Sequence, residues 1–344
     1  MATMNMHAWL RELNGAKSKK PLPILSFPSV RLLNVSVREL TADGALQAKG
    51  MRAVADRTDA AAAVSFMDLS VEAECFGAPV RFSEDDVPTV TERLIHDEEE
   101  AKALAIPSVG SGRTACYLQA IREASATITD RPVLAGMIGP FSLAARLLDV
   151  SEIMMDCYDE PETVHLVLEK VTAFLTQYAS AYKEAGANGV MIAEPVAGLL
   201  SPALEEEFSS PYVRSIVDAV QDESFAVIYH NCGANTPMML DSILSTGCAA
   251  YHFGNAIDLE RDILKQVSSD VLIMGNIDPV GVLRAGSPQE VREATLALLE
   301  RCARYPNFVL SSGCDIPPCA PWENLEAFFA ASAEFYRHPT RGDV

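Results

Sequence analysis

The sequence lacks a long hydrophobic run. No apolar stretch reaches the ~18 residues that a membrane-spanning helix needs. Charged residues are scattered near the N-terminus, so no apolar core precedes a cleavage site as it would in a secretory signal. We therefore expect a cytoplasmic protein with no membrane partner.

Basic residues are also scarce. Lys and Arg number 27 against 47 Asp and Glu, so the formal net charge is −20. Because nucleic-acid phosphates are bound by a concentrated basic face, this balance argues against a nucleic-acid partner. The acidic excess favours solubility but says nothing about the fold.

Internal repeats, low-complexity tracts and interdomain linkers are absent from the sequence as well. A length of 344 residues would permit two domains, but α/β barrels of this size commonly form one domain. Hydrophobic residues make up 49% of the chain, which is enough for a sizeable core. We expect a single domain over residues 1–344, with residues 1–22 as an N-terminal helical extension.

Short apolar runs recur along the chain, and most are separated by stretches of helix length. Near-continuous apolar strands are buried on both faces, which is typical of a parallel sheet. Helices are predicted at Glu160–Ala185 and Ser287–Tyr305, each with a proline at its start. The alternation predicts an α/β fold, specifically a (β/α)8 TIM barrel, with a doubly wound open sheet as the alternative. The predicted strands are Pro23–Pro28, Ala62–Asp68, Val133–Pro140, Gly189–Pro195, Ala226–Cys232, Ala249–Asn255, Val271–Pro279 and Phe308–Asp315.

Several predicted strands end in side chains that can take part in chemistry. These residues include Asp68, Glu194, Asn276 and Asp278. In a TIM barrel the carboxyl ends of the strands meet on one face, where the active site lies. The segment Gly77–Gly112 is rich in charge and proline, and we expect it to form a long excursion over this barrel mouth.

Two strand ends carry a pattern that indicates a metal site. His230 and Cys232 are two residues apart, so their side chains share one face of a strand. Cys314 ends the last predicted strand at the same rim. One imidazole and two thiolates suit zinc, and three protein ligands leave one tetrahedral position open, as in catalytic sites. The alternative is a histidine and a cysteine that pack in the core.

Other residues near these strand ends are weaker candidates for the metal. Glu194 is a candidate fourth ligand or a base beside the metal, with a solvated loop carboxylate as the alternative. Cys319 lies five residues beyond Cys314, but we expect Pro317 and Pro318 to turn the chain away from the site. In a large cytosolic chain, the eight cysteines are expected to be thiols or metal ligands rather than disulfides.

Five segments resemble the uroporphyrinogen decarboxylase superfamily, in particular its zinc-dependent corrinoid methyltransferase branch, which includes methylcobamide:coenzyme M methyltransferases. The resemblance implies that His230, Cys232 and Cys314 bind Zn2+. It also implies an enzyme that moves a methyl group between a corrinoid (cobalamin) protein and a small thiol or a methoxy- or methylamine-type substrate. The segments lie in the family's order and are Asp68–Gly77, Glu194–Pro202, His230–Pro237, Gly275–Pro279 and Ser311–Asn324.

The resemblance also implies roles for residues beside the metal. Asp68, Asn276 and Asp278 would position the substrate or groups around it, with loop capping as the alternative for Asn276 and Asp278. His252 would hydrogen-bond a substrate oxygen, with a satisfied histidine at the barrel end as the alternative. His252 and Asn255 stand where many thiol-using relatives resemble F-S-x-D, a departure that argues against coenzyme M itself as the acceptor.

The decarboxylase branch of the same superfamily is the alternative function. Asp68 falls on its catalytic aspartate, but its arginine-rich N-terminal motif, of the R-Q-A-G-R-Y kind, is missing. A substrate with many carboxylates needs matching cations in its pocket. The sequence also lacks the D-x-H-x-x-G cobalamin-binding signature, so the corrinoid is expected on a separate partner protein. A metal-storing or corrinoid-binding module without enzymatic activity is a third alternative.

Overall fold

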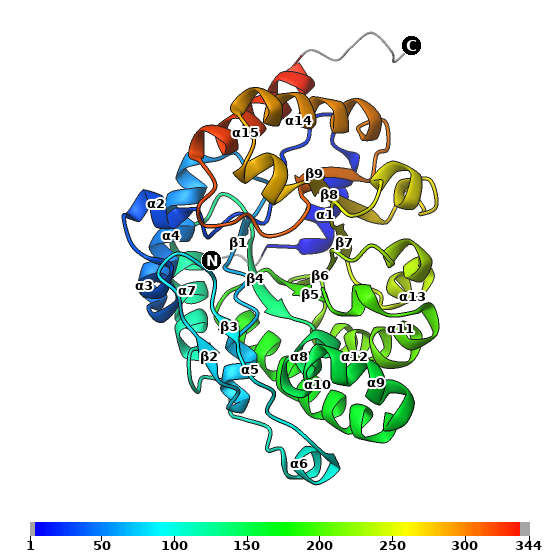
Figure 1. The fold of residues 1–344 in the computed structure, drawn as a ribbon. Coiled ribbons are helices and arrows are strands. Elements are labelled where there is room, and N and C mark those ends of the chain that lie inside the picture. Colours follow the sequence, from blue (N-terminus) through cyan, green and yellow to red (C-terminus); the bar gives the residue numbers. More distant parts are fainter. Residues whose placement is uncertain (1–3, 338–344) are drawn as a thin grey trace.

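Parallel strands form the centre of the molecule, as the apolar runs predict. The computed structural model describes residues 4–337. Within that range, seven parallel strands pair in chain order and curve into a barrel with helices around it (Figure 1). The α/β barrel prediction is therefore confirmed. The strands are β1 (Ala63–Val64), β4 (Val133–Ile138), β5 (Gly189–Ala193), β6 (Ala226–Asn231), β7 (Ala250–Phe253), β8 (Leu272–Ile277) and β9 (Phe308–Ser312).

The first predicted strand, Pro23–Pro28, is wrong, because no strand is assigned there. This part of the chain still crosses the seam between the two outer strands of the sheet. The Leu22 N–H donates to the Leu310 carbonyl of β9 at 2.9 Å, and the Ala61 N–H donates to the Pro21 carbonyl at 2.8 Å. Proline has no N–H to donate, so a segment rich in proline cannot form a continuous ladder. An irregular segment thus stands in the place of the eighth strand.

The helices lie outside the strands and begin at the expected signals. α10 begins with Pro161, and α14 begins after Ser287, which forms a capping box with Glu290. Both predicted helices are confirmed, α10 to within one residue at each end and α14 to within three residues. The helices are α1 (Met6–Gly15), α2 (Ser29–Leu33), α3 (Val37–Ala42), α4 (Gly44–Arg57), α5 (Val71–Phe76), α6 (Glu98–Ala103), α7 (Thr114–Thr127), α8 (Pro140–Leu148), α9 (Val150–Asp159), α10 (Pro161–Glu184), α11 (Pro202–Phe208), α12 (Ser210–Val220), α13 (Leu240–Ser245), α14 (Pro288–Cys302) and α15 (Trp322–Arg337). Shorter turns of helix are η1 (Ala197–Leu199), η2 (Thr236–Met239), η3 (Glu260–Leu264) and η4 (Pro279–Arg284).

Helix α1 closes the amino-terminal end of the barrel and lies behind the strands in Figure 1. Its buried residues Met6, Leu10 and Leu13 pack with the inward-facing side chains of the strands in one cluster. The Met6 N–H donates to the carbonyl of Glu223, just before β6. This helix lies in the predicted N-terminal extension, of which residues 1–3 lie outside the described residues.

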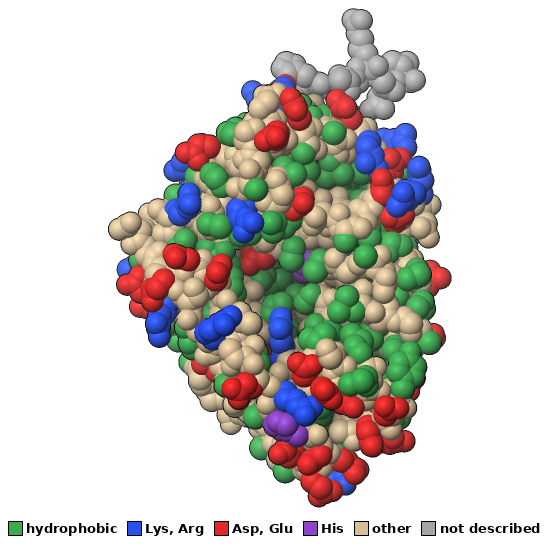
Figure 2. All heavy atoms as spheres, in the orientation of Figure 1, with side chains coloured by type: hydrophobic (Ala, Val, Ile, Leu, Met, Phe, Trp, Pro, Cys, Tyr) green, Lys and Arg blue, Asp and Glu red, His purple; other side chains and the backbone are tan. Residues whose placement is uncertain are grey.

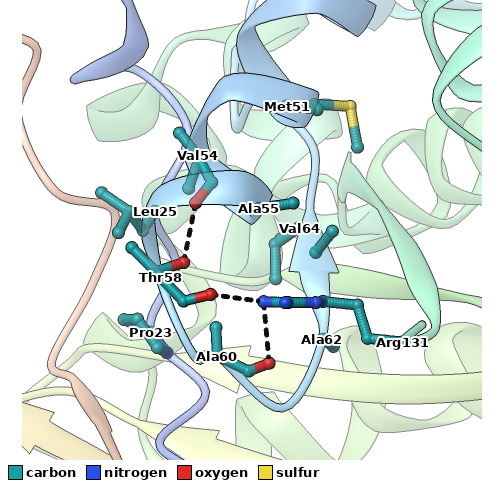
Figure 3. Close-up of a pocket in the computed structure, with 11 residues that line it drawn as sticks. Pro23, Leu25, Met51, Val54, Ala55, Thr58, Ala60, Ala62, Val64 and Arg131 are labelled. Carbon is teal, nitrogen blue, oxygen red and sulfur yellow. Dashed lines mark hydrogen bonds between the residues drawn. The ribbon is translucent and has the colours of Figure 1, made fainter. Parts of the chain in front are cut away.

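The start of β1 is fixed by a cation beneath it. Arg131 Nη1 donates to the carbonyl oxygens of Thr58 at 2.8 Å and Ala60 at 3.1 Å, as Figure 3 shows. The Thr58 hydroxyl donates back to the Val54 carbonyl at 2.8 Å. These bonds satisfy the last carbonyls of the turn between α4 and β1, so the short strand is held against β4.

Only part of the charged excursion reaches the carboxyl ends of the strands, because its helix α6 packs on the outer helix α10. The excursion contains the antiparallel pair β2 (Val80–Arg81) and β3 (Thr89–Val90). Arg81 and Phe82 of this segment line a cavity of about 760 Å³ together with Asp315, which follows β9. In the orientation of Figure 1, Figure 2 shows the face hollowed at its centre, with histidine atoms in the hollow. Within residues 4–337, no helix has the length and apolar character needed to cross a membrane.

Candidate metal centre

The structure brings the three predicted ligands together at the barrel mouth. His230 lies at the end of β6, Cys232 follows this strand directly, and Cys314 follows β9. One donor atom from each residue lies within 4.8 Å of the others. The histidine is buried and both cysteines are half-buried. Two sulfurs and one imidazole nitrogen at this separation suit zinc, so the residues present fit the metal that the sequence predicts.

Three glycines allow the loops to close around Cys232. A Cβ on Gly254, after β7, would lie 2.5 Å from the Cys232 Cα. A Cβ on Gly198 would lie 2.6 Å from the Cα of Gly233. Side chains at these positions would push apart the loops after β5, β6 and β7. A Cβ on Gly233 would lie 2.4 Å from the Gly198 Cα, so this residue is also needed for the close backbone contact.

The thiols of the two candidate ligand cysteines, Cys232 and Cys314, differ in pKa. A hydrogen bond from the Cys314 thiol, together with the nearby His230, lowers the pKa of Cys232 to about 4 despite its burial. The same hydrogen bond and burial raise the pKa of Cys314 well above its ordinary value. The protein alone therefore favours one thiolate and one thiol here. A divalent cation would stabilise both thiolates and release the remaining proton.

A second histidine supports the first. The Nδ1 atoms of His230 and His252 lie 2.8 Å apart, and His252 Nε2 lies 2.7 Å from the Ser311 hydroxyl. The Ser311 hydroxyl in turn donates to the Leu22 carbonyl at 2.7 Å. Burial, together with the neighbouring His230, lowers the pKa of His252 well below its ordinary value. Both ring nitrogens of His252 thus have protein partners, which agrees with the alternative of a satisfied barrel-end histidine.

Glu194 directly follows β5, the strand that pairs with β6 and its His230, but its carboxylate binds the start of a helix. It accepts hydrogen bonds from the backbone N–H groups of Phe141 and Ser142, both at 2.9 Å, and from the Ser142 hydroxyl at 2.7 Å. These groups form the first turn of α8, where a negative charge is favourable. Complete burial raises the pKa of Glu194 to about 7. The structure does not bring Glu194 into the group of candidate ligands, and its burial replaces the solvated alternative.

Asp68 is held by an ion pair that the sequence does not reveal. Its carboxylate is paired with the Arg113 guanidinium and accepts a hydrogen bond from the Tyr117 hydroxyl at 2.9 Å. Arg113 also pairs with Glu74 and lies 4.9 Å from the ring of Phe82, which lines the cavity. Asp68 and Arg113 are 45 residues apart in sequence, and no local pattern marks them as partners.

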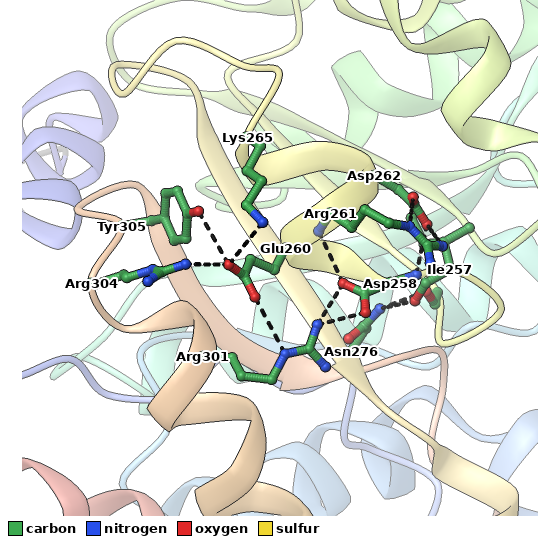
Figure 4. A network of polar contacts seen from close by, with 11 residues as sticks. Ile257, Asp258, Glu260, Arg261, Asp262, Lys265, Asn276, Arg301, Arg304 and Tyr305 are labelled. Carbon is green, nitrogen blue, oxygen red and sulfur yellow. Dashed lines mark hydrogen bonds and ion pairs between the residues drawn. The ribbon is translucent and has the colours of Figure 1, made fainter.

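The side chains of Asn276 and Asp278 both hydrogen-bond loop and helix-start backbone, as the alternative of loop capping predicts. The Asn276 amide donates to the carbonyls of Gly254 at 2.9 Å and Ile257 at 3.1 Å, which fixes the loop after β7 (Figure 4). Asp278 accepts from the first backbone N–H groups of η4 at 2.8 and 2.9 Å. Beyond this loop, Figure 4 shows Glu260 of η3 among cations that include Arg301 of α14. Neither predicted side chain joins the three donors.

Two further residues near Cys314 are Asp315, which faces the cavity, and Cys319, which faces the solvent. Asp315 lines the cavity, and burial raises the pKa of its carboxyl well above the ordinary value. Cys319 is exposed and lies outside the donor group, in agreement with the prediction that the two prolines turn the chain away. All eight cysteines, each within residues 4–337, are free of disulfide bonds.

A parallel barrel with these groups at its strand ends defines an α/β-barrel enzyme. A family model described as Uroporphyrinogen decarboxylase (URO-D) matches residues 25–335. The chain belongs to the uroporphyrinogen decarboxylase family.

The relatives include two kinds of enzyme. The methylcobamide:CoM methyltransferase MtbA of Methanosarcina acetivorans is 30% identical over 265 residues, which cover 75% of this chain and 75% of that protein. A uroporphyrinogen decarboxylase of Hydrogenovibrio crunogenus is 29% identical over 289 residues, covering 79% of this chain and 78% of that protein. The family relationship therefore includes methyl transfer and decarboxylation.

Solved structures support the fold. A methyltransferase from Methanosarcina mazei superposes with a TM-score of 0.85 at 23% identity, covering 97% of this chain and 99% of that chain. A B12-independent methionine synthase from Shewanella sp. W3-18-1 superposes with a TM-score of 0.58 at 13% identity, covering 94% of this chain and 98% of that chain. Both matches concern the architecture.

Proposed function

We propose that the protein is a zinc-dependent methyltransferase that acts between a corrinoid protein and a small thiol or methoxy- or methylamine-type substrate. The observation that carries this proposal is the meeting of His230, Cys232 and Cys314 at the barrel mouth. The MtbA relatives support it because they are methylcobamide:CoM methyltransferases by name. In this proposal the corrinoid is a substrate that arrives on a separate protein.

The three donors would hold zinc and leave one position for the substrate. Zinc bound there would lower the pKa of a substrate thiol or polarise the oxygen or nitrogen of a methyl donor. The unequal protonation of Cys232 and Cys314 prepares the pair to lose one proton on binding a cation. The half-buried mouth would orient the substrate and limit water around it.

The other predicted site residues have distinct roles in this proposal. Asp68, held by Arg113 beside the cavity, would position substrate groups. Asn276, Asp278 and Glu194 would act indirectly, because each fixes a loop or helix at the mouth.

Uroporphyrinogen decarboxylation is the second candidate function. It is favoured by the decarboxylase relatives and by Asp68, which by resemblance falls on the catalytic aspartate of that branch. A decarboxylase of this kind would keep its activity after complete removal of zinc, whereas the proposed methyltransferase would lose it.

Replacement of Cys314 by serine tests the proposed metal centre. The expected result is loss of the stoichiometric zinc of the purified protein, because a hydroxyl is a poorer ligand than a thiolate. Metal analysis would be coupled to a methylcobalamin spectral assay over a panel of thiols and methyl donors. The matched control is Cys319→Ser, which changes the nearby exposed cysteine outside the donor group and should keep both zinc and activity.

Two outcomes of this experiment would contradict the proposal. Full zinc content in Cys314→Ser would reject the assigned ligands. Loss of zinc with methyl transfer retained would reject the metal's role in the reaction.

A further inference from the structure

We infer that His252 and Ser311 are positioning residues that hold the His230 imidazole with Nδ1 protonated and Nε2 free for the metal. This inference rests on the proposed zinc site and extends it to two residues that do not touch the metal. The hydrogen-bonded series runs from the Leu22 carbonyl through Ser311 and His252 to His230. We refer to it below as the histidine relay.

The direction of the relay follows from its fixed end. A backbone carbonyl can only accept a hydrogen bond, so the Ser311 hydroxyl uses its one proton on Leu22 at 2.7 Å. The Ser311 oxygen must then accept the proton carried by His252 Nε2, 2.7 Å away. A neutral imidazole has one N–H, so His252 Nδ1 is left as an acceptor.

The last link sets the tautomer of the metal-binding histidine. Since His252 Nδ1 accepts, the His230 Nδ1 at 2.8 Å must donate. His230 Nε2 therefore keeps its lone pair, and this is the nitrogen that lies 3.4 Å from the Cys314 sulfur. The hydrogen bond of one ring nitrogen thus determines which nitrogen is available to a metal.

Packing also fixes the orientation of the rings. His230 and His252 are paired across neighbouring parallel strands, with their rings 4.7 Å apart at 73°. His252 and Ser311 are fully buried, and neither ring can rotate into solvent. A buried histidine N–H without a hydrogen-bond partner would destabilise the folded protein. The relay gives a partner to both ring nitrogens of His252 and to Nδ1 of His230.

The irregular segment at the barrel seam ends this relay. The Leu22 N–H donates to Leu310, the residue before Ser311, and this bond holds the Leu22 carbonyl over the serine hydroxyl. The segment that replaces the eighth strand therefore contributes to the metal centre through its backbone. A regular strand would place this carbonyl in a ladder with a backbone N–H instead.

Zinc affinity of Ser311→Ala, measured by competition with a chromophoric chelator, tests the relay. Without the acceptor for His252 Nε2, the fixed direction is lost, and we expect affinity to fall about 10- to 100-fold. The matched control is Ser312→Ala. Ser312 is also buried in β9 and also contacts the N-terminal segment, where its hydroxyl accepts from the Ile24 N–H, but it lies outside the relay. This control should bind zinc like the parent protein.

Two further variants separate the hydrogen bond from simple packing. His252→Phe keeps a ring in place but has no acceptor, and it should weaken zinc binding in a protein that stays folded by circular dichroism. His252→Asn retains an acceptor near the position of Nδ1 and should restore part of the affinity. Nitrogen NMR of the zinc-loaded parent protein should show the proton of His230 on Nδ1, a signature that a packing role alone does not require.

The outcomes distinguish this inference from the proposed function. Unchanged zinc affinity in both Ser311→Ala and His252→Phe, or a zinc-loaded His230 without a proton on Nδ1, would overturn the relay. Absence of zinc binding by the parent protein would reject the metal centre and the relay together. A relay intact by NMR and affinity in a protein without methyl transfer would support the inference and reject the proposed reaction.

Discussion

Glu72 is a buried carboxylate whose ionisation the fold opposes. Burial raises its pKa from the ordinary 4.5 to about 8; Oε1 accepts a hydrogen bond from the Ile138 N–H at 3.3 Å, and the buried Oε2 has no hydrogen-bond partner among the described residues. The native state thus keeps the proton up to about pH 8, whereas the unfolded chain loses it near pH 4.5. Because the native state binds more protons within this window, its free energy of unfolding falls as pH rises through the window.

Glu72→Gln should therefore gain stability relative to the parent protein as pH increases. Glutamine cannot ionise, so the difference in unfolding free energy should grow by at most about 1.4 kcal/mol per pH unit. Urea unfolding of both proteins at about pH 6 and about pH 8 would measure it. A difference that stays the same at the two pH values would contradict the raised pKa.

Single residues could be predicted where the chemistry is local. The period of two along a strand places His230 and Cys232 on one face, and the order of the strands brings Cys314 to the same rim. Ser311 and Arg113 could not be found in this way. Their partners lie 289 residues and 45 residues away, and only the assembled barrel brings them into contact.

The hydrogen bonds at the N-terminus of helix α8 depend on the glycine at position 139, which has no side chain. A Cβ on Gly139 would lie 2.4 Å from the carboxylate of Glu194, which accepts three hydrogen bonds from this helix. Gly139→Ala would force the buried carboxylate away from its donors. We expect a loss of about 1–3 kcal/mol in unfolding free energy, measured by urea unfolding.

The control for this change is Gly15→Ala at the end of α1. An added Cβ there meets no atom within 4 Å, and alanine favours the helix. A similar loss in both variants would show that the α8 contact is not the cause.

The helices and strands that can be predicted well are those whose own residues carry a start signal or a continuous apolar run. Proline at the first turn and a capping box mark α10 and α14, and continuous apolar runs mark the central strands. The segment Pro23–Pro28 has the apolar composition of a strand, but its prolines lack the N–H groups that a ladder needs. Apolar composition alone therefore does not identify a strand where the backbone lacks hydrogen-bond donors.

The barrel as a whole has one end closed by helix α1. Met6 is fully buried and packs in the cluster that fills the barrel interior. Met6→Ala should lower the free energy of unfolding by about 2–5 kcal/mol, because it leaves a cavity at the closed end. Thermal or urea unfolding would measure the change, with His7→Ala on the exposed side of the same helix as control. Equal effects of the two changes would contradict a sealing role for α1.

The seam of the barrel has a consequence for how the protein is made. Leu22 and Ser311 are separated by 289 residues, and Cys314 is 84 residues beyond His230. Contacts of such long range form slowly, since the intervening chain must be ordered first. During synthesis at about 5–20 residues per second, His230 and Cys232 leave the ribosome several seconds before Cys314. The nascent chain thus carries an incomplete ligand set for this interval, and tight metal capture has to wait for the last strand.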